Sequence, residues 1–192
     1  MNKIAYAVLL ATVISIPARA DWALNSDQSA LSFVSTKATN VAEAHKFTDL
    51  SGSVDAHGEV NIAIGLASVN TGIELRDERM REMLFNTAEY TAAGVSAKVD
   101  MASLDKIAVG QSVDLMLEGM LTLHGEARPL MMDVVVARAG DSRLLVISKK
   151  PVVVNATEFG LAEGVEALRE IAGLPSISLA VPVSFVLAFD KR

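Results

Sequence analysis

Two fourteen-residue stretches of this chain alternate apolar with small or polar side chains, and this alternation is the strongest constraint on the fold. In Gly110–Leu123 the odd positions from Val113 onward are apolar or glycine, and in Ser176–Phe189 the odd positions are apolar throughout. A period of two is typical of a β-strand with one buried face. Pro182 lies inside the second stretch and predicts a bulge or an unpaired segment there, because proline lacks an amide hydrogen.

Shorter stretches with the same alternation, or with continuous apolar character, predict further strands. They lie at residues 30–36, 42–47, 50–54, 60–67, 95–101, 130–137 and 144–154. Only Arg76–Phe85 and Glu163–Ile171 have apolar side chains at helical spacing. Many one-faced strands with two short helices predict an all-β barrel or sandwich. A strand of about 14 residues is roughly 46 Å long, so a barrel of such strands could enclose an elongated apolar ligand.

The first twenty residues fit a secretory signal peptide. Lys3 precedes the apolar run Ile4–Ile16, and a small-x-small "ARA" motif ends the segment, so we expect cleavage before Asp21. The alternative, a membrane anchor, is disfavoured because about 20 apolar residues are needed to span a bilayer. Residues 21–192 would then form one domain, secreted to the periplasm and without stable membrane insertion.

Cleavage would leave an acidic domain without cysteine. The whole chain has 17 basic and 23 acidic residues, and the first twenty contain two basic residues and no acid, so the net charge changes from −6 to −8. An acidic surface argues against nucleic acid and anionic membranes as partners, because both are bound by basic surfaces. Without cysteine the domain has neither a disulfide nor a lipoprotein attachment site.

Several motifs, spread in order over almost the whole domain, resemble the YceI-like family of periplasmic lipid-binding proteins. They are "DW", "SALSF", "DLSGSV", "ASVNTG", "LRDERM", "LFNTAEY", "GMLTLHGEARPLMMDV" and "TEFGL". The most specific are Thr71-Gly72 followed by Arg76-Asp77, and the block Gly119–Pro129 with its "LTLHG" centre. The resemblance implies a lipocalin-like, eight-stranded antiparallel barrel whose apolar lumen holds a polyisoprenoid, a quinone or a similar long-chain amphiphile.

The resemblance also bears on whether the barrel is open or filled. From physical principles alone, a small barrel is normally filled by its own side chains. The family's open lumen instead makes the apolar strand faces and the first helix into ligand contacts. The ligand-binding set that we expect on this basis consists of Phe33, Arg76, Asp77, Met80, Leu84, Leu115, Leu117, Leu121, Val183 and Phe185.

The charged segment Glu74–Glu82 stands apart from the apolar strands, and two interpretations of it remain open. Arg76 and Asp77 form a polar rim that meets a ligand head group, or they form a structural ion pair or a helix start, at which the helix dipole favours Asp77. The apolar side of the same helix, with Met80 and Leu84, forms an adaptable lid over the barrel, or packs as an ordinary helix against its end.

The sequence contains no motif that points clearly to a metal or to catalysis. His45, His57 and His124 lack further ligands at metal spacing, so turn or hydrogen-bonding roles are favoured. The "SLDK" at Ser103–Lys106 matches the S-x-x-K of penicillin-recognising enzymes, but the S-D-N and K-T-G motifs are missing and a polar turn is favoured. We therefore expect no catalytic residue, metal or cofactor, and only a bound lipid as ligand.

Three hypotheses about function follow. The leading one is a soluble periplasmic carrier or scavenger of a long-chain isoprenoid or other amphiphile. A second is a hydrolase or isomerase that acts on a lipid in the same lumen, with Asp77 or His124 as acid or base. A third is a stress-response or inhibitor module that binds another protein through the charged helix. A homodimer is compatible with all three.

Overall fold

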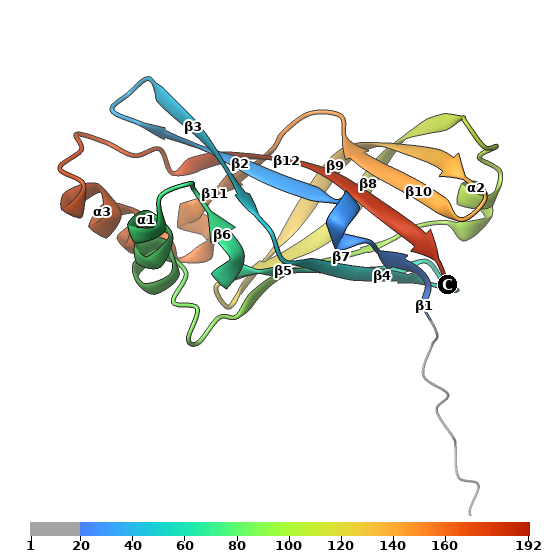
Figure 1. Cartoon of the computed structure of the whole chain (residues 1–192), viewed down its shortest axis with the longest axis horizontal. Helices are drawn as coiled ribbons and strands as arrows, with labels where there is room; N and C mark the ends of the chain where they lie inside the picture. Colours follow the sequence, from blue (N-terminus) through green and yellow to red (C-terminus); the bar gives the residue numbers. More distant parts are fainter. Residues whose placement is uncertain (1–19) are drawn as a thin grey trace, which may run out of the picture.

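The computed structural model describes residues 20–192, so the expected signal peptide lies outside the described residues except for Ala20. The described part is mostly β-sheet, with helices gathered at the two ends of an elongated molecule (Figure 1). Among these residues, none of the helices has the length and apolar character needed to cross a bilayer.

The sheet closes on itself as an antiparallel barrel of eight strands, three of which are interrupted. The interrupted strands are β1 (Ala20–Leu24) with β2 (Ala30–Lys37), β3 (Val41–Phe47) with β4 (Leu50–Asp55), and β10 (Arg143–Ser148) with β11 (Val152–Asn155). The uninterrupted strands are β5 (Glu59–Gly65), β7 (Ala92–Lys98), β8 (Ser112–Leu123), β9 (Glu126–Gly140) and β12 (Ala180–Lys191). The two-residue strand β6 (Val69–Asn70) adds to the edge of β3.

Pairing around the barrel follows the order of the chain. Each barrel strand is hydrogen-bonded to the strands before and after it, and the ring closes where β12 pairs with both β1 and β2. The same β12 pairs on its other side with β10 and then β11, which shows that the interrupted segments occupy one position in the ring. The predicted eight-stranded antiparallel barrel is therefore confirmed.

Helical segments cover both ends of the barrel. At one end lie α1 (Glu74–Arg79), the π-helical turn η3 (Met80–Leu84), the short turn η4 (Ala156–Phe159) and α3 (Ala162–Ile171). At the other end lies α2 (Met101–Asp105), close to the C-terminus (Figure 1). Two further 3₁₀ turns, η1 (Ser26–Gln28) and η2 (Leu66–Ser68), fall between strands. We call the two ends the α1/α3 end and the α2 end.

The sequence-based elements agree with the structure in type, and the differences are local. The two predicted helices correspond to α1 with η3 and to α3, but α2 was not predicted, and Ser103–Lys106 is the end of this helix rather than a turn. Pro182 pairs with Val153 of β11 without a bulge. On the side of β12 that faces β2, pairing begins only at Val183, so the predicted unpaired segment lies on the β2 side. Leu179 precedes β12 and is exposed, contrary to the predicted strand.

The period-two alternation turns one face of every barrel strand toward the interior. In β5, Ile62 and Ile64 are buried, while the intervening Ala63 faces outward. Long strands such as β9, with 15 residues, therefore supply a continuous series of inward apolar side chains along the barrel axis. This inward series is the starting point for the candidate site.

Candidate functional site

The interior of the barrel contains two cavities lined only by apolar residues. The larger has a volume of about 170 Å³ and lies toward the α1/α3 end, and the smaller has a volume of about 100 Å³ and lies toward the α2 end. An apolar cavity of about 150 Å³ stays free of water and can hold a benzene-sized molecule. The barrel is thus not a filled core, and its free space suits apolar groups.

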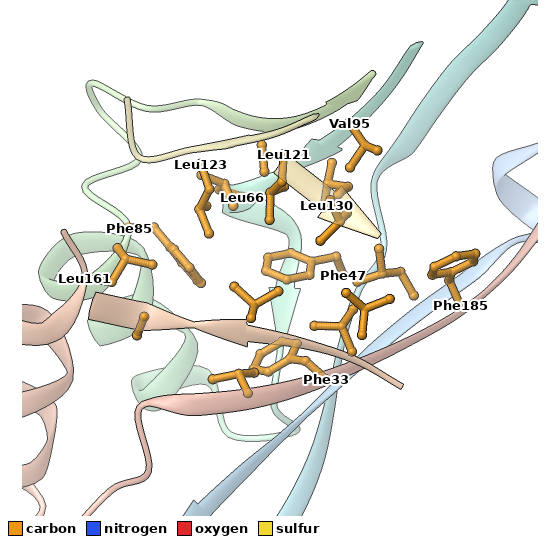
Figure 2. A pocket seen from close by; sticks show the side chains of 18 of the residues that line it. Phe33, Phe47, Leu66, Phe85, Val95, Leu121, Leu123, Leu130, Leu161 and Phe185 are labelled. Carbon is orange, nitrogen blue, oxygen red and sulfur yellow. The ribbon is translucent and has the colours of Figure 1, made fainter. Parts of the chain in front are cut away.

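Inward side chains from both strands and helices surround the larger cavity (Figure 2). Phe85 and Leu161 reach in from the helical side, and Leu121 and Leu123 of β8 approach from the barrel wall. The remaining lining residues are Leu31, Phe33, Phe47, Ile64, Leu66, Met80, Leu84, Ala93, Val95, Leu130, Met132, Val152, Val154, Ala156, Val181, Val183 and Phe185.

Five residues line both cavities and form a narrow section between them, which we call the waist. The waist consists of Leu31, Ile64, Val95, Met132 and Phe185. Met132 has an unbranched side chain that adapts to irregular apolar partners. The waist can therefore change width without moving the backbone. The two cavities thus lie on either side of the same side chains, and we call them together the lumen.

Most of the predicted ligand-binding residues lie on this lumen. The larger cavity is lined by six of them, Phe33, Met80, Leu84, Leu121, Val183 and Phe185. Leu117 lines the smaller cavity. Leu115 packs against the core but lines neither cavity, and Arg76 and Asp77 also lie outside both. Whether any of the ten contacts a ligand stays a prediction.

Several lining residues were not predicted. Phe47 and Met132 belong to stretches whose strand character was recognised, whereas Trp22 lies in β1, which was not predicted. The signal was therefore present for Phe47 and Met132. Ala156 and Leu161 lie in the connection between β11 and α3, where no period indicates which side chain turns inward.

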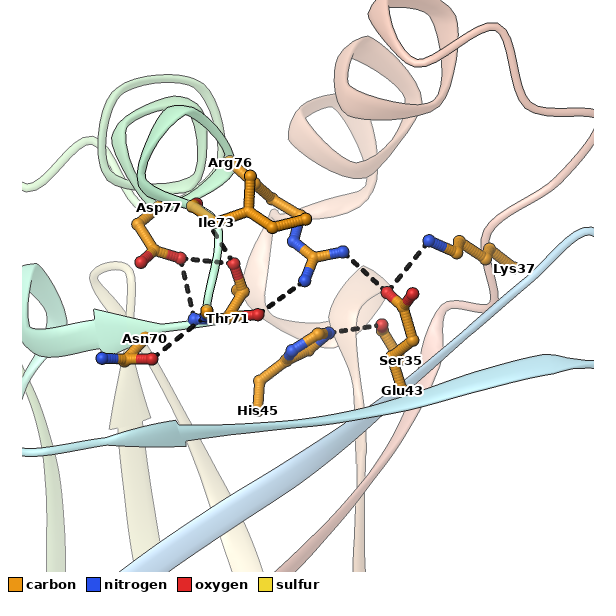
Figure 3. Close-up of polar contacts among 10 residues, drawn as sticks. Ser35, Lys37, Glu43, His45, Asn70, Thr71, Ile73, Arg76 and Asp77 are labelled. Carbon is orange, nitrogen blue, oxygen red and sulfur yellow. Dashed lines mark hydrogen bonds and ion pairs between the residues drawn. The ribbon is translucent and has the colours of Figure 1, made fainter.

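Thr71 connects the charged helix to the barrel wall (Figure 3). Its backbone N–H and its hydroxyl donate to the Asp77 carboxylate at 2.8 Å and 2.5 Å, and its carbonyl oxygen accepts from Arg76 Nη2 at 2.7 Å. Gly72 follows with φ of +77°, a conformation that glycine adopts without strain. The Thr71-Gly72 and Arg76-Asp77 signature thus forms the start of α1, and Asp77 is only 8% exposed.

Arg76 and Asp77 do not pair with each other, so of the structural alternatives the helix start is confirmed and the ion pair is wrong. Arg76 Nη1 instead lies 2.6 Å from Glu43 on β3, which also accepts from Lys37 on β2 at 2.9 Å. The hydrogen bond from Lys37 holds the pKa of Glu43 below its usual value, and Arg76 lowers it further. Glu43 therefore joins α1 to the β2–β3 ladder at the α1/α3 end of the lumen.

His45 lies between this polar network and the lumen. It is 5% exposed, its Nε2 is 2.8 Å from the Ser35 hydroxyl, and its ring centroid is 5.2 Å from that of Phe33. Burial lowers the pKa of the imidazole below its usual value of 6.5, and Arg76 lowers it further, so the ring is neutral near pH 7. The predicted hydrogen-bonding role of His45 is confirmed, but its position beside the lumen was not foreseen.

The helical cover of the α1/α3 end is held together by close backbone contact. The π-helical turn is closed by a 2.9 Å bond from the Phe85 N–H to the Met80 carbonyl, which directs both side chains toward the larger cavity. A Cβ at Gly164 of α3 would lie 2.6 Å from the Met83 carbonyl oxygen and 2.9 Å from Leu84 Cα. Only glycine at this position lets α3 lie directly on η3.

The described residues include no group of three or more acidic or histidine side chains placed to hold a metal ion. His57 is exposed in the β4–β5 turn, and His124 lies in the β8–β9 turn with its ring centroid 4.3 Å from that of Tyr90. Neither residue lines the lumen. The lumen wall itself consequently offers packing surface and no reactive side chain.

Comparisons with known proteins agree with this arrangement. The sequence profile of the YceI-like domain matches residues 22–189. No curated protein matched the chain. Among solved structures, a polyisoprenoid-binding domain from Saccharophagus degradans, described as implicated in plant cell wall breakdown, is 38% identical with a TM-score of 0.89, covering 91% of this chain and 100% of that one.

More distant structures share the fold. BcnA of Burkholderia cenocepacia is 21% identical with a TM-score of 0.67, covering 86% of this chain and 98% of that one. The Campylobacter jejuni YceI protein is 17% identical with a TM-score of 0.56, covering 77% and 84%. With the profile match over nearly all described residues, these findings show that the chain belongs to the YceI-like family.

Proposed function

We propose that this protein is a periplasmic carrier that sequesters a long-chain isoprenoid, a quinone or a similar amphiphile in its barrel. The observation that carries the proposal is the lumen, two cavities that share five lining residues and whose lining residues are all apolar. The similar domain from Saccharophagus degradans is described as polyisoprenoid-binding, and its 38% identity extends over 91% of this chain. This likeness supports the same class of ligand here.

The energetics of burial favour a long chain over a small apolar molecule. Each buried methylene contributes about 0.8 kcal/mol, so the affinity grows with the length of chain that the lumen accepts. The larger cavity alone holds a group of benzene size, and a longer chain must pass the waist into the smaller cavity. A ligand that fills both cavities would bury the most methylene groups and therefore bind most tightly.

A catalytic function in the same lumen has less support. Asp77 already accepts two hydrogen bonds from Thr71, and His124 stacks on Tyr90 in a turn, and neither lines a cavity. A lipid in the lumen would therefore meet no acid or base of the second hypothesis. The third hypothesis, a protein-binding module, also loses support because Arg76 and Asp77 are engaged within the chain.

The location follows from the sequence alone. Its first twenty residues have the features of a signal peptide, and the periplasm is the compartment in which a cysteine-free carrier could move lipid between membranes. N-terminal sequencing of protein recovered from the periplasmic fraction should begin at Asp21. A membrane-bound chain that retains Met1 would contradict this location.

The function is tested by mass spectrometry of an organic extract of the protein purified from its native periplasm. We expect one class of isoprenoid or quinone at near-equimolar amounts. A matched extract from a Leu121→Asp, Val183→Asp variant, with two charges in the larger cavity, should contain much less. Extracts with no lipid from the unaltered protein, or equal amounts from both, would contradict the proposal.

A further inference from the structure

Three methionine side chains lie exposed on the outer face of the β8–β9 ladder. The exposed fractions of Met116, Met120 and Met131 are 57%, 40% and 54%. Methionine is among the residue types that are most often buried in proteins. The inward side chains of the same two strands, such as Leu117 and Met132, already supply the apolar packing of the barrel. Packing of the core therefore does not account for the three exposed thioethers.

The register of the ladder places Met131 between the other two methionines. Met131 pairs with Glu118. The other two methionines lie two residues before and two residues after Glu118 on the same face, so each is a diagonal neighbour of Met131. Diagonal neighbours on an antiparallel pair lie about 7–8 Å apart, a distance that long side chains can bridge. Met116 and Met120 are four residues apart on one strand, or about 13 Å. An ion held by two of the three sulfurs therefore needs Met131 in either case.

Carboxylates separate the three thioethers. Asp114 and Asp133 share this face, and each is paired with a lysine. Glu118 is exposed and takes part in none of the ion pairs formed among residues 20–192. A methionine surface that docks a protein is contiguous and apolar, whereas here a charged residue lies next to each sulfur-bearing side chain. Sulfur and oxygen donors interleaved in this way favour a cation over an apolar partner.

The type of ligand atom restricts the cation. Thioether sulfur is a soft ligand that selects Cu(I), whereas Mg²⁺ and Mn²⁺ prefer oxygen. The chain has no cysteine, so its sulfur ligands can come only from methionine. We propose that Met116, Met120 and Met131 bind one soft monovalent cation, Cu(I) or its analogue Ag(I), with Glu118 supplying an oxygen ligand and a compensating negative charge. We call these four residues the thioether site.

The thioether site is separate from the proposed lipid site. None of its four residues lines either cavity, and their side chains lie on the opposite face of the barrel wall. Binding of the cation is therefore a second property of the protein, and it does not depend on the proposed carrier function.

Silver(I), a redox-stable analogue of Cu(I), is the probe that tests the site. Protein labelled with ¹³C in its methionine methyl groups is titrated with Ag(I) in chloride-free buffer, and the methyl signals are followed by NMR. We expect the signals of Met116, Met120 and Met131 to move and to stop moving at one Ag(I) per chain. The signal of Met83, which is 37% exposed on η3, should stay in place. Zn²⁺ should move none of them, because its ligands are thiolate, imidazole and carboxylate.

Leucine variants assign the binding to individual sulfurs. Leucine has nearly the volume of methionine but no sulfur, so the variants should keep the fold. Met131→Leu should abolish Ag(I) binding, because the two remaining sulfurs belong to side chains about 13 Å apart. Met116→Leu and Met120→Leu should each weaken binding without abolishing it, because each leaves one diagonal pair. Met83→Leu replaces an exposed methionine outside the site and is the matched control, which should bind Ag(I) as before.

Cu(I), supplied without oxygen as its acetonitrile complex, should move the same methyl signals in the unaltered protein. Ag(I) binding that persists in Met131→Leu, or that is lost equally in Met83→Leu, would overturn the thioether site. Signals that respond to Zn²⁺ as strongly as to Ag(I), or that do not respond to Ag(I), would overturn it as well. The lipid extracted from Met131→Leu should equal that of the unaltered protein, so failure of this site leaves the lipid carrier intact.

Discussion

The two ends of the barrel are both covered by helix, yet they differ in how their polar groups are satisfied. At the α2 end, Arg138 donates to the carbonyl oxygens of Ile107 at 2.7 Å and Leu104 at 2.9 Å, and Trp22 beside it is 2% exposed. At the α1/α3 end, two buried nitrogens lack partners, and Leu75 on α1 is 55% exposed. The guanidinium at the α2 end is hydrogen-bonded, whereas two buried nitrogens at the α1/α3 end are not.

The difference assigns a stabilising role to the α2 end and makes the α1/α3 end the candidate for function. A saturated end with a buried indole contributes to stability and offers a ligand only apolar packing surface. An end with a π-helical turn and unsatisfied donors is less stable than the sequence could make it, and such departures occur where function requires them. The proposed carrier would therefore exchange its ligand at the α1/α3 end.

The largest effect on stability is expected at the α2 end, from Trp22→Ala. Loss of a buried aromatic side chain costs about 3–5 kcal/mol, and the indole also contacts the cations of Arg138 and Lys191. Urea unfolding monitored by circular dichroism measures the change. Phe85→Ala at the other end removes a smaller ring, so it should cost less, and equal losses would contradict the distinction between the ends.

A smaller destabilisation is expected where α3 lies on η3, from Gly164→Ala. The added Cβ would overlap the backbone of Met83 and Leu84, and overpacking of this kind costs about 1–3 kcal/mol. Because the contact holds the helical cover, bound lipid should also dissociate faster. Gly140→Ala, whose Cβ would meet nothing within 4 Å, is the matched control. Unchanged lipid release would show that the cover does not limit exchange.

Little change in stability is expected from Leu117→Trp in the smaller cavity. A filled core would lose about 1–3 kcal/mol on such overpacking, whereas free space of about 100 Å³ accepts added volume. The bound chain should instead become shorter, because the far cavity is occupied. Mass spectrometry of extracted lipid measures the chain length. A variant that melts much earlier and still carries the full-length lipid would contradict the open lumen.

The smallest effect concerns pH and His45. Because burial lowers the pKa of the imidazole below 6.5, the folded state favours the neutral ring, and its contribution to stability is complete above pH 6.5 and lost as the pH falls through the folded-state pKa. Urea titrations should show this loss in the unaltered protein and not in His45→Phe. The hydrogen bond from Lys37 lowers the pKa of Glu43, so its contribution is lost only below pH 4.5, whereas the loss from His45 begins already below pH 6.5.

The sequence predicted the strands because the period of two is a property of each strand by itself, but this period left a barrel and a sandwich open, and only the family resemblance favoured the barrel. Inward positions such as Val183 and Phe185 followed directly from the period. The helix α2 was missed although its start carries a signal, since Asp100 accepts from Ala102 N at 3.1 Å and from Ser103 Oγ at 2.6 Å. The helix has only five residues, so the cap was not followed by a helical period and the segment was predicted as a turn.

The candidate site was less accessible to sequence reasoning. The sizes of the cavities depend on how side chains from opposite walls fill the space, and alternation along one strand says nothing about the opposite wall. His45 alternates with Glu43 and Phe47 on one face, but its position near Arg76 depends on where α1 lies, about 30 residues further along the chain. The meeting of these distant segments is a property of the folded barrel.

The way the ring closes has a consequence for how this protein acquires its shape. Neighbouring strands follow one another along the chain, except that β12, at residues 180–191, must pair with β1 and β2 at the other terminus. Seven strands can assemble locally as hairpins, but the final seam joins the most distant parts of the sequence, which is a slow step. Until it forms, the apolar inner surface lies open along its whole length. A lipid met during that interval could be enclosed by the folding chain itself.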